Sequence, residues 1–82
     1  MKIRIEDETY EGSGTEIMEQ LRETLGRGEC SYTASYITQL RANFIRSTGL
    51  ECDLPVAGVE RRARAMIAQL AKTGALEVLD DG

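Results

Sequence analysis

The apolar residues of this 82-residue chain change their spacing along its length, and this change limits the folds that it can form. Near the start, Ile3 and Ile5 alternate with charged residues, a period of two that is typical of a half-buried β-strand. Near the end, residues 76–79 form a second short apolar run. Between these segments, apolar residues recur three or four positions apart, as in amphipathic helices. The sequence therefore predicts strands at both ends and helices in the middle.

The first strand is predicted to turn back in a β-hairpin, through a loop over residues 6–9. The register that we expect places Ile5 opposite Tyr10. It also places Arg4 opposite Glu11, so that an apolar pair lies on one face and an opposite-charge pair on the other. A two-residue loop would give the same register, but the sequence lacks the Asn-Gly pair that favours such a tight turn.

Three helices are predicted between the strands, over about residues 13–25, 32–48 and 57–73. The first begins with a capping box, in which Ser13 caps the helix and Glu16 reaches back to the backbone N–H of Ser13. The side chains expected to face inward are Ile17, Met18, Leu21, Leu25, Tyr36, Ile37, Leu40, Phe44, Ile45, Val59, Ala63, Met66, Ile67, Leu70 and Ala71.

The order β-β-α-α-α-β indicates an α+β fold in a single compact domain over residues 1–82. Two or three short strands cannot shield a core by themselves, so the helices must pack on the sheet. We expect a small three-stranded, mostly antiparallel sheet that three helices cover on one face. The last strand is expected beside the first, which is longer and more apolar than the second, and residues 79–82 are expected to fray.

Two parts of the chain are similar to parts of known folds. The hairpin and capped helix of residues 2–25 resemble the opening of the ubiquitin-like β-grasp fold. That family continues with further strands, whereas two helices follow here, and the C-terminal Gly-Gly of ubiquitin-like proteins is absent. Residues 66–79, a helix, Gly74 and an apolar strand, resemble the last helix and first wing strand of winged-helix domains. This second resemblance implies DNA binding, but the short turn of a helix-turn-helix pair is missing before it.

The chain contains no histidine, and this argues against several kinds of catalysis. Histidine is the commonest general base near neutral pH, the usual partner of a Ser or Cys nucleophile, and the commonest metal ligand. The two cysteines, Cys30 and Cys52, are 22 positions apart and do not complete a four-coordinate zinc site, even with Asp53. We therefore expect a protein that is not an enzyme and that holds no metal or other cofactor.

Three further features suggest chemistry, but each has a simpler structural role. Cys30 precedes a predicted helix, whose dipole could lower the pKa of its thiol, yet a small half-buried cysteine is the simpler interpretation. Gly26 and Gly28 could offer backbone N–H groups to an anion, although no strand precedes them and a third glycine is missing. The acidic residues 6–8 lack the spacing of a calcium-binding loop.

Charge is unevenly distributed along the chain, whose net charge is −4. Residues 1–30 contain four basic and eight acidic residues, whereas residues 31–76 contain six basic and three acidic ones. The candidate surface for a partner or for nucleic acid consists of the arginines of the second and third helices: Arg41, Arg46, Arg61, Arg62 and Arg64.

The sequence supports two hypotheses of function. The first, reached by exclusion, is a non-catalytic module that binds another protein or itself. Dimerisation would be unsurprising, because a domain this small has a thin margin of stability. The alternative is a small DNA-binding transcriptional regulator whose arginines contact phosphates, which the acidic net charge opposes. No segment has the pattern of a signal peptide or of a membrane span of about 20 apolar residues. We therefore expect a cytoplasmic protein that does not engage membranes.

Overall fold

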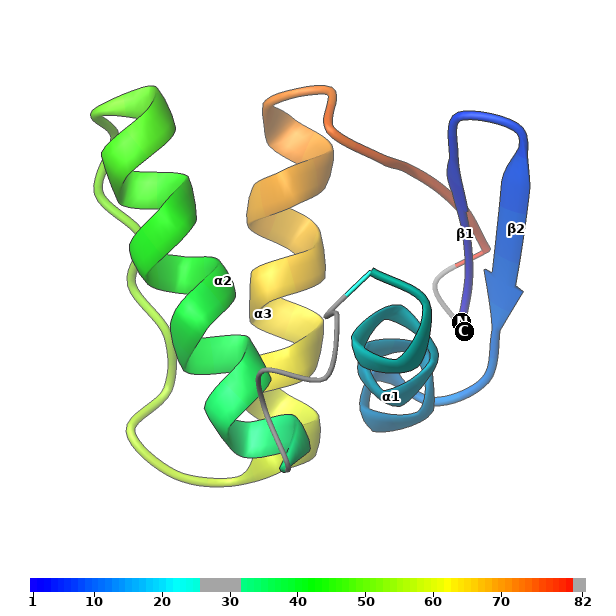
Figure 1. The fold of residues 1–82 in the computed structure, drawn as a ribbon, viewed down its shortest axis with the longest axis horizontal. Coiled ribbons are helices and arrows are strands. Elements are labelled where there is room, and N and C mark those ends of the chain that lie inside the picture. The colour runs from blue at the N-terminus through cyan, green and yellow to red at the C-terminus, as the bar shows by residue number, and fades with distance from the viewer. Residues whose placement is uncertain (26–31, 81–82) are drawn as a thin grey trace.

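A computed structural model describes residues 1–25 and 32–80, and it has the predicted α+β fold (Figure 1). The strands are β1 (Lys2–Ile5), β2 (Glu8–Glu11) and β3 (Glu77–Asp80). The helices are α1 (Gly14–Leu25), α2 (Thr33–Thr48) and α3 (Val59–Lys72). The strands form one antiparallel sheet in the order β2-β1-β3, so the last strand lies beside the first, as expected. β3 includes Leu79 and Asp80, two of the four residues expected to fray, and residues 81–82 lie outside the described part.

The β1–β2 hairpin forms, but its predicted loop and register are wrong. Ile3 lies opposite Tyr10, and Ile5 lies opposite the first residue of β2. The loop consists of Glu6 and Asp7 alone, and Glu6 has a φ of 55°, in the left-handed region. Because the register differs by two residues from the predicted one, the faces of the strands are unchanged. Ile3 and Tyr10 are therefore both buried on the face that meets the helices.

The other face of the sheet is covered by charged side chains. Lys2, rather than Arg4, lies opposite Glu11 in the neighbouring strand. Arg4 instead forms an ion pair with Glu77 of β3. All four residues are exposed, and exposed pairs of this kind each contribute at most about 1 kcal/mol. This face is therefore exposed to water, and its charged pairs contribute little to the stability of the fold.

The helices form two layers behind the sheet. In Figure 1, α3 stands between the sheet and α2, and α1 lies beside the hairpin. Among the described elements, α1 contacts β2 and α3 contacts β3, whereas α2 contacts α1 and α3 and no strand. Thus α1 and α3 cover the sheet directly, and α2 closes the core from the far side.

One cluster of buried side chains joins all of these layers. Its members are Ile3, Tyr10, Ile17, Met18, Leu21, Tyr36, Ile37, Phe44, Cys52, Ala63, Met66, Ile67 and Leu76. Most of the helical residues expected to face inward belong to it or pack at its edge, but Val59 is 39% exposed. Val59 is exposed because it is the first residue of α3, two positions later than the predicted start. No helix in the described part of the chain is long and apolar enough to span a bilayer.

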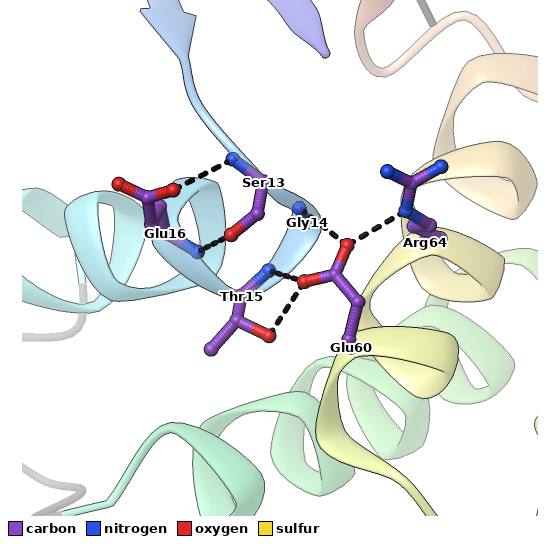
Figure 2. Close-up of polar contacts among 6 residues, drawn as sticks. All are labelled: Ser13, Gly14, Thr15, Glu16, Glu60 and Arg64. Atoms are coloured by element: carbon purple, nitrogen blue, oxygen red, sulfur yellow. Dashed lines mark hydrogen bonds and ion pairs between the residues drawn. The ribbon is translucent and has the colours of Figure 1, made fainter. Parts of the chain in front are cut away.

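The helix ends follow the local signals of the sequence. The N–H of Ser13 donates to Glu16 Oε1 at 3.1 Å, and the N–H of Glu16 donates to Ser13 Oγ at 3.1 Å, which confirms the capping box (Figure 2). After α2, Gly49 has a φ of 72°, and its N–H donates to the carbonyl oxygen of Ile45 at 2.9 Å. A glycine adopts this left-handed conformation without the steric cost that a Cβ would bring.

The conformation of Glu6 generates a test of the hairpin loop. Replacing Glu6 with Asn should raise the free energy of unfolding by up to about 1 kcal/mol, because Asn tolerates the left-handed region better than Glu does. Asp7→Asn is the matched control: it removes the same charge from the same loop at a residue whose φ is not positive. Urea denaturation of both variants measures the difference. Equal stabilisation by both would mean that charge, and not backbone conformation, limits this loop.

Candidate functional site

A groove of about 600 Å³, open to solvent, lies between one side of α3 and strand β3. Its lining residues are Met1, Arg64, Ile67, Ala68, Ala71, Lys72 and Val78. Most of them are apolar, and none carries a carboxylate, hydroxyl or thiol group. The groove is therefore an apolar channel whose only charged lining side chains are two cations.

The helical wall of the groove is one stripe of α3. It begins at Arg64 and continues three, four, seven and eight positions later, with Ile67, Ala68, Ala71 and Lys72. This spacing places all five residues on one side of the helix. Ile67 is fully buried and forms the floor. The two alanines at the centre have short side chains, which leaves the space open. The two cations lie at the ends of the stripe, about 12 Å apart along the helix axis.

The opposite wall is formed by the sheet. Val78 of β3 is half-buried and packs at the edge of the core. β3 pairs with β1 on one side only, and no described strand pairs with its other edge. Such an edge presents backbone N–H and C=O groups that can pair with another chain. The groove thus runs beside a strand that can accept a further strand.

One end of the groove is fixed by a cluster around Glu60, shown in Figure 2. Glu60 Oε2 accepts hydrogen bonds from the N–H of Gly14 at 2.9 Å and from Nε of Arg64 at 2.6 Å. Glu60 Oε1 accepts from the N–H and from the hydroxyl of Thr15, both at 2.8 Å. The first N–H groups of a helix have no partner within that helix, so Glu60 of α3 caps α1 from outside.

These contacts perturb the carboxyl group of Glu60. The hydrogen bond from Arg64, followed by the bonds from Thr15 and Gly14, lowers the pKa of Glu60 from 4.5 to about 2. Burial opposes this shift but is outweighed. Glu60 therefore stays ionised at any physiological pH, and its role is to hold α1 and α3 together.

The close approach of α1 and α3 also requires a glycine at position 14. A Cβ added to Gly14 would lie 2.9 Å from Cγ and 3.2 Å from the backbone nitrogen of Arg64. Arg64 is thus positioned by packing against Gly14 and by its bond to Glu60. Figure 2 shows the two terminal nitrogens of its guanidinium turned away from Glu60. The side chain remains 50% exposed, so these nitrogens are accessible to a ligand.

The arginines singled out in the sequence have different surroundings. Arg41 donates from Nε to the carbonyl oxygen of Cys52 at 2.7 Å, and Arg62 donates to Thr38 Oγ1 of α2 at 3.4 Å. Arg64 is bound to Glu60 on the side of α3 that meets α1. The remaining two, Arg46 and Arg61, are exposed. Three of the five arginines therefore contact three different parts of the fold, and only Arg64 lines the groove.

Cys52 is part of the core. It is 1% exposed, and its Sγ lies 4.0 Å from Sδ of Met66. Burial raises the pKa of the Cys52 thiol, although the nearby Arg41 charge lowers it. Cys30 and the glycines at 26 and 28 lie outside the described residues. Within residues 1–25 and 32–80, no group of three or more His, Cys, Asp or Glu side chains is placed to hold a metal ion.

Sequence reasoning missed both the groove and the role of Glu60. The spacing along the chain did not show that Arg64 and Lys72 bracket two alanines that face a strand. Glu60 lies 45 or more positions from the residues that it caps, and no local pattern links such distant positions. An acidic residue in the first turn of a helix has a simpler explanation, namely its favourable interaction with the helix dipole.

The cap leads to a prediction about acid stability. Glu60→Gln should lower the free energy of unfolding by about 1–2 kcal/mol at pH 7, because a charged acceptor for three donors of α1 and for Arg64 is lost. Because the folded-state pKa of Glu60 is depressed, its stabilisation is present above pH 4.5 and is lost as the pH falls towards 2. Its partial exposure keeps the effect modest.

Denaturation curves of the wild type and of Glu60→Gln between pH 7 and pH 2 measure this effect. The difference between the two proteins should shrink across pH 4.5 to 2. Glu23→Gln, at an exposed position of α1, removes the same charge and should change stability by less than about 0.5 kcal/mol. A constant gap between Glu60→Gln and the wild type over the whole range would contradict the role of the ionised carboxylate.

Comparison with known proteins gives no relative from which a role could be transferred. No protein-family model matches the sequence, and the searches found no matching curated protein and no matching solved structure.

Proposed function

We propose that this chain is a non-catalytic protein-interaction module that binds an extended segment of a partner protein along the groove between α3 and β3. One observation carries the proposal: an apolar groove lies next to a strand with an open edge. An extended segment added at such an edge gains main-chain hydrogen bonds, while its alternate side chains enter the neighbouring pocket. The apolar lining would bury side chains of the partner segment, and hydrogen bonds at the strand edge would orient its backbone.

The shape and chemistry of the groove favour a macromolecular ligand over a substrate. Sites for small molecules commonly bury 70% or more of the ligand surface, whereas this groove is open. Its charged groups are Arg64 and Lys72, and neither has a base or nucleophile beside it among the lining residues. The groove can bind and orient a chain, but it offers no group for acid–base or covalent chemistry.

The charges of the open strands favour a different protein over a second copy of this one. In a fully overlapping antiparallel pair of β3 strands, Glu77 of one copy would face Asp80 of the other. The other edge strand, β2, also has acidic residues at both ends, Glu8 and Glu11. Like charges directly opposite each other destabilise strand pairing. These like charges disfavour self-association through β2, and at β3 they oppose it less, because Glu77 is paired with Arg4.

The alternative, a DNA-binding regulator, has weaker support. Its five arginines include Arg41 and Arg64, which are hydrogen-bonded within the protein, and the chain has a net charge of −4. We expect a short DNA duplex, titrated at low salt, to leave the ¹H–¹⁵N NMR spectrum of the chain unchanged. Shifts at Arg46 and Arg61 that are reversed by added salt would instead support the regulator, because phosphate contacts weaken steeply with salt.

The groove proposal predicts the effect of filling the groove. Peptides selected from a random display library against the wild-type chain should bind Ala68→Arg at least about tenfold more weakly, since the new side chain occupies the channel. Ala42→Arg is the matched control, because Ala42 is exposed on α2 and does not line the groove. Thermal unfolding checks that both variants are folded. Selected binders that are equally tight on both variants would rule out the groove as the binding surface.

A further inference from the structure

Resting on this proposed function, we infer that the partner segment is acidic: it carries two carboxylates four positions apart on the side that faces the groove, with an apolar residue midway between them. The segment has the pattern acid–x–apolar–x–acid in an extended conformation. The two carboxylates pair with Arg64 and Lys72, and the apolar side chain lies over Ala68 and Ala71. The remaining two side chains of the motif point away from the groove.

The spacing of the motif follows from helix and strand geometry. Arg64 and Lys72 are eight residues apart on one side of α3, which places their backbones about 12 Å apart along the axis. An extended segment rises about 3.3 Å per residue, and its side chains alternate between two faces. Residues four positions apart therefore share a face and are separated by about 13 Å. The two lengths match, so one carboxylate can reach each cation.

The centre of the groove selects an apolar residue of moderate size. The side chain midway between the carboxylates lies on the same face as they do. It meets the short side chains of Ala68 and Ala71, with buried Ile67 below and Val78 on the sheet side. These residues offer no hydrogen-bonding side chain, so a polar group placed there would lose its water contacts without compensation.

Each end of the groove keeps cationic N–H donors for a ligand. The side chain of Lys72 is exposed and makes no hydrogen bond or ion pair with the described residues. Arg64 uses Nε to bind Glu60, and its terminal nitrogens point away from that carboxylate (Figure 2). On the neighbouring strand, Glu77 is paired with Arg4 on the far face of the sheet. The charged side chains that line the groove are thus both cations, Arg64 with its charge partly offset by Glu60 and Lys72 without an ion-pair partner among the described residues.

Three synthetic peptides test this inference against the full chain at 0.15 M salt, where the Debye length of about 8 Å screens the distant acidic residues. The first contains Glu-Thr-Val-Thr-Glu within an extended β-forming sequence. The second has Gln in place of both Glu residues. The third has the same composition as the first, but its Glu residues are three positions apart and so point to opposite faces. Binding is followed by NMR shifts of the groove residues.

The first peptide should bind about four- to twenty-five-fold more tightly than the second, at two- to fivefold for each exposed ion pair. It should also bind more tightly than the third. Lys72→Gln should weaken the first peptide two- to fivefold and leave the second unchanged. Arg46→Gln is the matched control, because it removes the same charge from the last turn of α2 and should change neither affinity.

The possible failures separate the two proposals. Equal affinity of the first two peptides, or of the first and third, would overturn the acidic motif. Failure of all three peptides to bind would overturn it as well. In each case the interaction module would stand if library-selected peptides still lost affinity with Ala68→Arg, and it would fall if none did.

Discussion

The hydrogen bonds between Glu60 and the start of α1 are the interaction on which the arrangement of the helices depends. They give partners to the N–H groups of Gly14 and Thr15, which would otherwise lack them at the end of a helix. They also fix Arg64, and the missing side chain of Gly14 lets α3 approach closely. One carboxylate thus joins α1 to α3 and positions one end of the groove. Because its pKa lies near 2, this junction persists across the physiological pH range.

The two sides of α3 have different roles. One side carries Ala63 and Met66 into the core, where they help to connect the sheet to α2, and Ile67 lies at the boundary between the core and the groove. The other side presents Ala68 and Ala71 to the groove and leaves apolar surface open to water. For a domain of 82 residues this is a cost, since small domains bury a limited fraction of their surface and have little stability to spare. A partner that covered the groove would recover this burial, which is consistent with a binding role.

The sheet contributes specificity through its charges. Its outer face is hydrated by cross-strand pairs of opposite charge, such as Arg4 with Glu77. Its open edges have acidic residues at the ends of their strands, which disfavours pairing with an identical copy. In the proposed complex, a strand from another protein pairs with β3 and contacts the cations of α3 on the groove side.

The sequence by itself determined the elements and their order, because strand alternation, helical stripes and caps such as Ser13 with Glu16 act between residues a few positions apart. It also determined which face of each strand is buried, since a shift of two residues preserves that face. It did not determine the hairpin turn, where Glu6 adopts a left-handed conformation without the usual Asn-Gly signal. Only the tertiary structure decided that Glu60 caps a helix 45 residues away and that α3 and β3 enclose a groove. Both depend on how the elements pack in space, and spacing along the chain carries no information about contacts between such distant residues.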